Sequence, residues 1–337
     1  MDRYARQIAF PKIGNDGQKK LLASRIAVVG MGALGTVSAS QLARAGIGFL
    51  RLIDRDHVEI TNLQRQMLYT EQDAADEVPK AIAAADRLKE ANSGIEIEPM
   101  LVDLNSGNAD ALLADVDLVV DASDNFEVRL LINETCKHHH IPWIYGAAIQ
   151  SRGMTMNFLG GEQDPCFCCV LQNNHITTDP RQTCSSAGVL GMITSIIASL
   201  QAVEAIKILT GSDEVRKDLL QIDAWSGQIH HLSFHQWEEC PVCAGNYSYY
   251  GKVAGSQITS LCGRAVMQVV PAHPAQVDFD QYAARLGRLG KVKQSRFALD
   301  YDNGEIGFKL FPDGRALIRH VHDEGRAKSI YAEYIGL

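Results

Sequence analysis

The chain has 337 residues, of which 46% are hydrophobic and 21% charged, and its formal net charge is −8. A chain of this length can bury a large core and predicts about two domains, while the acidic balance argues against general affinity for nucleic acid. Residues 1–25 contain no apolar run after their basic residues, so we expect no signal peptide and a cytoplasmic protein.

Short apolar strands alternate with helices through residues 25–145. We expect strands at 25–29, 49–53, 95–100, 117–121 and 142–145, with helices at 33–45, 80–91 and 126–138. This alternation is typical of a parallel sheet whose two faces are both covered by helices.

The pattern changes after Gly146. Further strands, antiparallel in our interpretation, are expected at 154–159, 219–223 and 228–234, and a long helix at 188–209 separates the first of them from the other two. The uncharged part of that helix has 15 residues, fewer than the roughly 20 that a membrane span needs. We therefore expect a buried helix or a subunit interface, and no membrane association.

A stretch rich in Gly, Ser and Tyr follows near residue 245. It predicts a boundary between a domain at 1–247 and a small α+β domain at 248–337. The predicted fold class is therefore α/β, with a Rossmann-like mixed sheet, helices on both faces and a small C-terminal α+β domain of unknown role.

A glycine-rich loop follows the first predicted strand and opens the first helix. Gly30, Gly32 and Gly35 allow a tight turn and close approach of the backbone to a phosphate. Asp54 ends the second strand, where a carboxylate can accept hydrogen bonds from ribose hydroxyls. These features suit an ATP site and an NAD site equally.

Charged residues farther along the chain favour ATP. Arg65 and Lys80 follow the second strand and can neutralise phosphates, because arginine offers a planar fork and lysine a compact charge. Asp124 follows the fourth strand and is suited to hold Mg²⁺ beside a triphosphate. The structural alternatives are a surface ion pair for Arg65, a solvated helix residue for Lys80 and a helix N-cap for Asp124.

Two cysteine pairs predict a metal site. Cys166 and Cys169, together with Cys240 and Cys243, offer the four thiolates of a closed structural zinc centre. Unligated buried thiols or a redox pair are the alternatives. Cys168 lies within the first pair, so the choice of ligands there stays open by spacing alone.

These motifs give the chain a specific resemblance. Together with Arg3–Gln7, Asn62–Gln66, Pro79-Lys80, Ser123–Asn125 and Gly146–Ile149, they make residues 3–243 similar to the MoeB/ThiF family of adenylyltransferases, which are relatives of ubiquitin-activating enzymes. The family usually has Thr where this chain has Ser123, so the hydroxyl is retained.

The resemblance implies a reaction and its partners. Members adenylylate the C-terminal glycine of a small ubiquitin-like sulfur carrier, ThiS-like or MoaD-like, with MgATP, for thiamine or molybdopterin biosynthesis. They act as homodimers in which the arginine matching Arg6 reaches the neighbouring subunit's triphosphate. We include Asn62 and Asn125 among the nucleotide-binding residues, and the family pattern selects Cys166 and Cys169 over Cys168.

Three points stay open from the sequence. Cys184 matches a cysteine that links covalently to the carrier in ThiF-like members but is dispensable in MoeB-like members. The extra C-terminal residues either pack against the core or dock the carrier or a sulfur-donor protein. An NAD-dependent oxidoreductase and a catalytically silent partner subunit remain as alternative functions, although neither explains why Arg65, Lys80 and Asp124 occur together.

Overall fold

The computed structural model describes residues 2–172, 187–252, 257–260, 266–271 and 276–336. The chain divides into two compact units, Met1–Lys252 and Val253–Leu337. The first unit contains the glycine-rich loop and both cysteine pairs.

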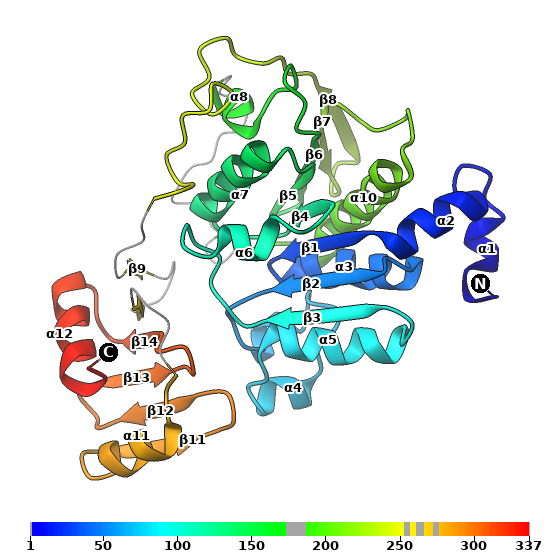
Figure 1. The fold of residues 1–337 in the computed structure, drawn as a ribbon. Helices are drawn as coiled ribbons and strands as arrows, with labels where there is room; N and C mark the ends of the chain where they lie inside the picture. Colours follow the sequence, from blue (N-terminus) through cyan, green and yellow to red (C-terminus); the bar gives the residue numbers. More distant parts are fainter. Residues whose placement is uncertain (1, 173–186, 253–256, 261–265, 272–275, 337) are drawn as a thin grey trace. The chain divides into compact units, whose positions relative to one another are not determined.

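An eight-stranded mixed sheet forms the centre of the first unit (Figure 1), with the strand order β3-β2-β1-β4-β5-β6-β7-β8. Its strands are β1 (Arg25–Val29), β2 (Phe49–Ile53), β3 (Glu96–Met100), β4 (Leu118–Asp121), β5 (Trp143–Ile149), β6 (Arg152–Phe158), β7 (Leu219–Asp223) and β8 (Gln228–Leu232). The pairs from β3 to β5 are parallel, and β5 through β8 pair antiparallel. The predicted mixed sheet is confirmed.

Helices cover both faces of this sheet. They are α1 (Ala5–Ile8), α2 (Gly14–Ala23), α3 (Ala33–Ala45), α4 (Glu71–Ala75), α5 (Lys80–Ala91), α6 (Ala109–Leu113), α7 (Phe126–His139), α8 (Phe167–Gln172) and α10 (Gly191–Thr210), with short 3-10 segments η1 (Asp2–Tyr4) and η2 (Ile60–Asn62). Figure 1 shows α6 and α7 on one face and α3, α5 and α10 on the other.

The alternation of side chains along β1 explains the two layers. Ile26 and Val28 are buried in one hydrophobic cluster with residues of α3, α5 and α10. Ala27 and Val29 belong to a second cluster with residues of α6, α7 and α8. Because successive side chains of a strand point to opposite faces, an uninterrupted apolar strand requires a helix layer on each side.

The N-terminal helices were not among the predicted elements. Helix α2 has glycines at positions 14 and 17, which lower intrinsic helix propensity. At Gly17 a Cβ would lie 3.3 Å from Thr210 at the end of α10. Tertiary packing against α10 therefore supports a helix that local sequence disfavours.

The second unit contains an antiparallel sheet with the order β11-β12-β13-β14-β10-β9. Its elements are β9 (Gln257–Ser260), β10 (Val266–Val270), α11 (Phe279–Leu286), β11 (Lys291–Gln294), β12 (Leu299–Asp302), β13 (Gly307–Leu310), β14 (Ala316–Arg319) and α12 (Glu324–Tyr334). Strands β9 and β11 were not predicted. Strand β11 has one apolar residue in four and lies at the sheet edge, where charged side chains are common.

A buried carboxylate of α7 binds the end of the first unit. Glu134, 2% exposed, accepts hydrogen bonds from the backbone N–H groups of Ser248, Tyr249 and Tyr250, the shortest being 2.6 Å. These three residues therefore belong with the first unit, although the sequence placed the boundary at 247.

Candidate active site and metal centre

Steric contacts require two of the three loop glycines. Gly30 has a φ of +91°, and a Cβ there would lie 2.7 Å from the carbonyl oxygen of Ala122. A Cβ at Gly35 would lie 1.8 Å from the carbonyl oxygen of Gly30. Gly32 is the N-cap of α3 and offers no side-chain cap, so the first backbone N–H groups of α3 are left for an anion.

Asp54 joins the end of β2 to this loop. Its two carboxylate oxygens accept hydrogen bonds from the backbone N–H groups of Met31 and Asp56, each at 2.7 Å. Removal from water raises the pKa of Asp54, and the nearby charge of Lys80 opposes that shift. Each oxygen retains a further lone pair, so the carboxylate can still accept from a ribose hydroxyl.

Lys80 begins α5 with a buried ammonium. The residue is 7% exposed, and its Nζ lies 3.2 Å from Oδ2 of Asp56. Burial lowers the pKa of Lys80, but the charges of Asp56, Asp54 and Asp124 outweigh burial and raise it above the usual value. The solvated-helix alternative for Lys80 is therefore excluded, and the site keeps a charged ammonium beside the glycine loop.

Asp124 lies on the loop after β4, and its carboxylate is exposed. The N-cap of α7 is Asn125, whose side chain accepts from the backbone N–H groups of Glu127 and Val128. The N-cap alternative for Asp124 is therefore wrong, because its neighbour performs that task. The contact between Gly30 and Ala122 places this loop directly against the glycine loop.

The segment containing Asn62 and Arg65 packs beside the same loop. The backbone N–H of Met67 donates to Thr36 in the first turn of α3, and Gln66 approaches Gly32. The buried Asn62 accepts from the backbone of Glu59, which shapes η2. Arg65 donates to the carbonyl of Thr61 at 3.0 Å, which is a backbone group and not a carboxylate.

One expected residue lies apart from this cluster, and another lies outside the described residues. Arg6 is exposed on α1, and no contact with another residue that the structure describes brings it to the glycine loop. Cys184 falls in the range 173–186, outside the described residues.

The four expected cysteines converge. The Sγ atoms of Cys166, Cys169, Cys240 and Cys243 all lie within 4.8 Å of one another. Neighbouring Sγ atoms are 3.5–3.8 Å apart, and a tetrahedral zinc bound by sulfur at about 2.3 Å requires a spacing of about 3.8 Å. The donor set therefore fits zinc.

The surroundings of this centre raise the pKa of its buried thiols. A hydrogen bond with Cys168, together with burial, raises the pKa of Cys166, and burial raises the pKa of Cys240 to about 11. Cys168 lies outside the group of four, where its thiol accepts from Asn133 at 3.8 Å. Without a cation the cluster favours neutral thiols, so metal binding would be coupled to proton release.

Sequence reasoning missed three residues around the nucleotide loop. Asp56 pairs with Lys80, the hydroxyl of Tyr69 donates to the carbonyl of Met31 at 2.6 Å, and Arg129 pairs with Asp121 at 2.8 Å. The spacing of Asp56 two residues after Asp54 was a usable signal. Tyr69 and Arg129 lie in ordinary-looking segments and gave none.

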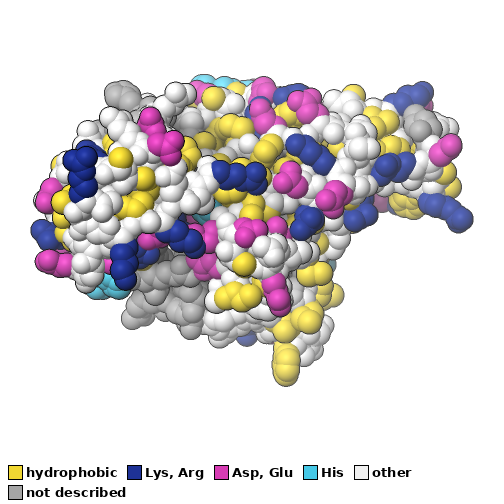
Figure 2. All heavy atoms as spheres, turned by 90° about the horizontal axis from the view of Figure 1, so that it is seen from below, with side chains coloured by type: hydrophobic (Ala, Val, Ile, Leu, Met, Phe, Trp, Pro, Cys, Tyr) yellow, Lys and Arg dark blue, Asp and Glu magenta, His cyan; other side chains and the backbone are white. Residues whose placement is uncertain are grey.

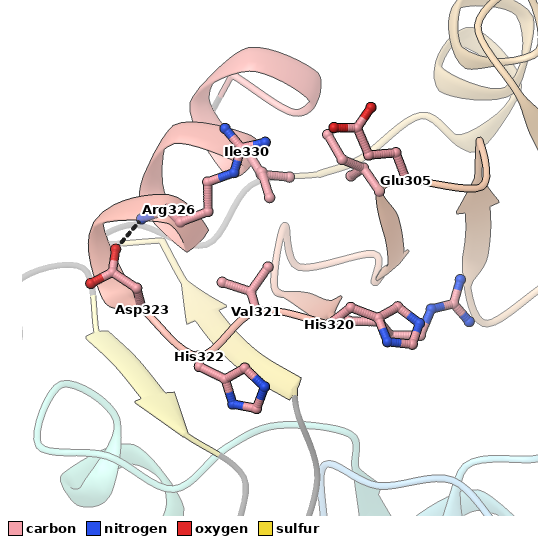
Figure 3. Close-up of a pocket in the computed structure, with 9 residues that line it drawn as sticks. Glu305, His320, Val321, His322, Asp323, Arg326 and Ile330 are labelled. Carbon is pink, nitrogen blue, oxygen red and sulfur yellow. Dashed lines mark hydrogen bonds between the residues drawn. The ribbon is translucent and has the colours of Figure 1, made fainter.

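The second unit has a separate pocket between β14 and α12 (Figure 3). His320, His322, Arg326 and Glu305 are among the residues that line it, and the backbone N–H of Arg326 donates to Asp323. It shares no residue with the nucleotide motifs. On the face seen in Figure 2, basic and acidic side chains are interspersed, so no single-sign field covers that face.

The sequence matches the ThiF family over residues 4–242, and the chain therefore belongs to that family. It is 37% identical to the sulfur carrier protein ThiS adenylyltransferase of Bacillus subtilis, with 99% of each chain covered. It is also 37% identical to the molybdopterin-synthase adenylyltransferase of Escherichia coli, over 72% of this chain and 96% of the relative.

A solved structure supports the fold. Escherichia coli MccB with ATP has a TM-score of 0.62 and 22% identity, and the match covers 72% of this chain and 74% of MccB. The expected family and fold class are thus confirmed. The match to the Bacillus subtilis relative covers 99% of the chain and so includes the second unit, whereas the match to the molybdopterin-synthase relative covers 72% of it.

Proposed function

We propose that this protein adenylylates the C-terminal glycine of a ubiquitin-like sulfur carrier with ATP. The observation that carries the proposal is the buried, charged Lys80 beside a glycine loop whose helix N-terminus is uncapped. Relatives that cover the chain well are named for this activity. The glycine loop and Asp54 also suit a hydride-transfer site, so it is Lys80 together with the carboxylate of Asp124 that favours MgATP.

The chemistry follows from charge. A carrier's terminal carboxylate is ionised at neutral pH, with an ordinary pKa of about 3.5, so no general base is needed. One carboxylate oxygen attacks the α-phosphorus, the bond from that phosphorus to the bridging oxygen breaks, and pyrophosphate leaves with the bonding electrons. Lys80 and Arg65 would neutralise the phosphate oxygens during the displacement, and Asp54 would hold the ribose.

Asp124 supports Mg²⁺ as the second cofactor. Its carboxylate is exposed, is not used as a cap and lies close enough to Lys80 to raise the pKa of that residue. A hard divalent cation prefers such an oxygen donor and the oxygens of a triphosphate. The cation would offset phosphate charge while Asp124 fixes its place.

Zinc is the proposed metal of the four-cysteine centre, where it would have a structural role. The centre joins α8 to residues 240–243, which are distant in sequence. A closed set of four thiolates leaves no open position for substrate.

A homodimer would supply Arg6 to the site. Helix α10 is long and apolar enough by composition to span a membrane. The core helix of a soluble protein can have the same length and composition, and 44% of the most apolar window of α10 is buried. Met192, Ile196 and Val203 remain exposed on it at 66%, 39% and 48%. This stripe has the spacing of one helix face and suits a second copy of the chain.

The full-length match favours a ThiS-like carrier and thiamine biosynthesis over a MoaD-like carrier. The relative that shares both units is named for ThiS. Cys184 would then form the covalent link with the carrier, as in ThiF-like members. A Cys184→Ser variant should retain adenylylation and lose that link in the mass spectrum of the carrier complex.

The test incubates the full chain with labelled ATP and a ThiS-like or a MoaD-like carrier. We expect pyrophosphate release and a carrier whose C-terminus gains the mass of AMP. A silent partner subunit would leave the carrier unchanged despite binding ATP. An oxidoreductase would bind NAD and fail to modify either carrier, and either result would overturn the proposal.

A further inference from the structure

A buried ion pair lies beneath the loop that carries Asp124. Arg129 in α7 is 7% exposed, and its Nε donates to Oδ2 of Asp121 at 2.8 Å. Asp121 is fully buried at the end of β4. The cation also lies over the ring of Tyr145, 4.8 Å from the centroid, so the guanidinium is held on several sides.

The same pair fixes the backbone on one side of Asp124. Nη2 of Arg129 donates to the carbonyl of Ser123 at 2.8 Å, while Oδ1 of Asp121 accepts from the backbone N–H of Ser123 at 3.0 Å and from its hydroxyl at 2.6 Å. Asn125 on the other side is fixed by its capping bonds to α7. Asp124 therefore has an exposed side chain between two anchored residues.

Stability alone is a weak explanation for this pair. Dehydrating two charges offsets much of their attraction, and buried ion pairs are often no more stabilising than apolar residues of similar size. An apolar pair, however, could not form hydrogen bonds with the carbonyl, the N–H and the hydroxyl of Ser123. The geometry of the loop is thus the property that depends on Arg129.

We propose that Arg129 is a positioning residue for the divalent-cation site. Through Asp121 and Ser123 it holds the Asp124 carboxylate beside Lys80 and the glycine loop, so that MgATP meets a preset oxygen donor. The inference rests on the proposed function, since it assumes that Asp124 receives the cation of a nucleotide.

The experiment uses the full-length protein with Arg129→Met and Arg129→Lys. Binding of Mn²⁺, as a Mg²⁺ substitute, to the protein with a non-hydrolysable ATP analogue is measured by electron paramagnetic resonance. We expect Arg129→Met to weaken Mn²⁺ binding by about tenfold or more, the loss typical of a missing hydrogen bond to a charged group. Arg129→Lys keeps the charge with fewer donors in place and should recover part of that binding.

The Mg²⁺ dependence of carrier-driven ATP–pyrophosphate exchange gives a second readout. The Mg²⁺ concentration for half-maximal rate should rise by about the same factor in Arg129→Met, while the KM for the carrier stays within about twofold, because Arg129 is 7% exposed and bonded to Asp121 and Ser123. If Arg129 had a purely structural role, its substitution would not raise the Mg²⁺ midpoint while leaving the KM for the carrier unchanged.

Arg51→Met is the matched control. Arg51 in β2 is also 7% exposed and pairs with Glu98 and Asp115, neither of which belongs to the candidate site. The Arg51→Met variant should have a lower melting temperature than the parent and the same affinity for Mn²⁺. An Arg129→Met protein with unchanged Mn²⁺ affinity, or an Arg51→Met protein with an equal loss, would overturn the inference.

Three further outcomes are also decisive. If Arg129→Met does not fold, an Arg129→Lys protein with the parent's Mn²⁺ affinity and Mg²⁺ midpoint would overturn the proposal. If the parent binds Mn²⁺ and nucleotide but activates no carrier, the proposed function fails while the Mn²⁺ comparison still decides the role of Arg129. A parent that binds no nucleotide would overturn both.

Discussion

At the residue scale, the charge of Lys80 depends on the carboxylates around it. Lys80 is buried, and a buried ammonium ordinarily loses its proton more easily; three carboxylates reverse that tendency. Asp56 is the one of these carboxylates within hydrogen-bonding distance of the ammonium.

Lys80→Ala should lower carrier-dependent ATP–pyrophosphate exchange by at least about a hundredfold, because a preorganised charge at the phosphates is lost. Lys89→Ala is the control, since Lys89 is exposed on the same helix. Exchange rates and thermal melting of both variants would be measured. A Lys80→Ala protein that exchanges at the rate of the control would contradict the assigned role.

Some residues of the candidate site could be predicted from the sequence and others could not. Gly30, Gly35 and Asp54 were predictable, because a turn after a strand and a carboxylate at a strand end are local patterns. Arg129 was not predictable, since an arginine within a helix is usually a surface residue. Only the packing of α7 against β4 makes it the partner of Asp121.

At the scale of elements, the four-cysteine cluster links α8 to a distant segment of the chain. Helix α8 has six described residues, and Cys166 and Cys169 at its start connect it to residues 240–243. Trp237 donates its backbone N–H to Cys169, which adds to the same junction. A helix this short depends on such tertiary contacts.

The full-length protein should contain about one zinc per chain, as a closed four-thiolate site requires. Cys166→Ser should lose the metal and melt at a lower temperature, because metal binding contributes to folding. Cys168→Ser is the matched control on the same segment and should keep the metal, as its thiol lies outside the group of four. Metal analysis and calorimetry measure both effects; equal zinc loss in the control would mean that Cys168 is a ligand.

Elements with strong local patterns were predicted better than those without. Strands β1, β4 and β5 follow largely apolar runs, and helices α3, α5 and α7 follow clear helix starts. Helix α2 and strand β11 were missed, because glycines in α2 and charges in β11 hide elements that packing and an edge position support. The antiparallel part of the sheet was expected from the change of pattern after Gly146.

At the scale of the whole molecule, the proposed dimer makes a distinctive prediction. Arg6→Ala and Lys80→Ala should each be inactive alone. A mixed dimer should regain activity, because one of its two sites combines an intact Lys80 with Arg6 from the Lys80→Ala subunit. Exchange would be measured after mixing and reassembly, with mixed dimers counted by native mass spectrometry; mixed dimers without activity would exclude action of Arg6 across the interface.

The second unit can be tested by its removal. Among the described residues, each hydrophobic cluster contains residues of one unit only. A chain ending at Lys252 should therefore fold and exchange pyrophosphate within about threefold of the full-length rate, as expected for units with separate cores. Circular dichroism and exchange with a saturating carrier check this. A folded but inactive truncation would indicate that the second unit docks the carrier.

The sequence by itself determined the nucleotide loop, the four cysteines and the family, because these depend on residue types at short, regular spacings. The tertiary structure decided which carboxylates surround Lys80 and what anchors Asp124. Asp56 meets Lys80 across 24 residues of chain, and Arg129 in α7 meets Asp121 at the end of β4. Residue spacing alone does not give these contacts, because they depend on how each helix packs against the strands.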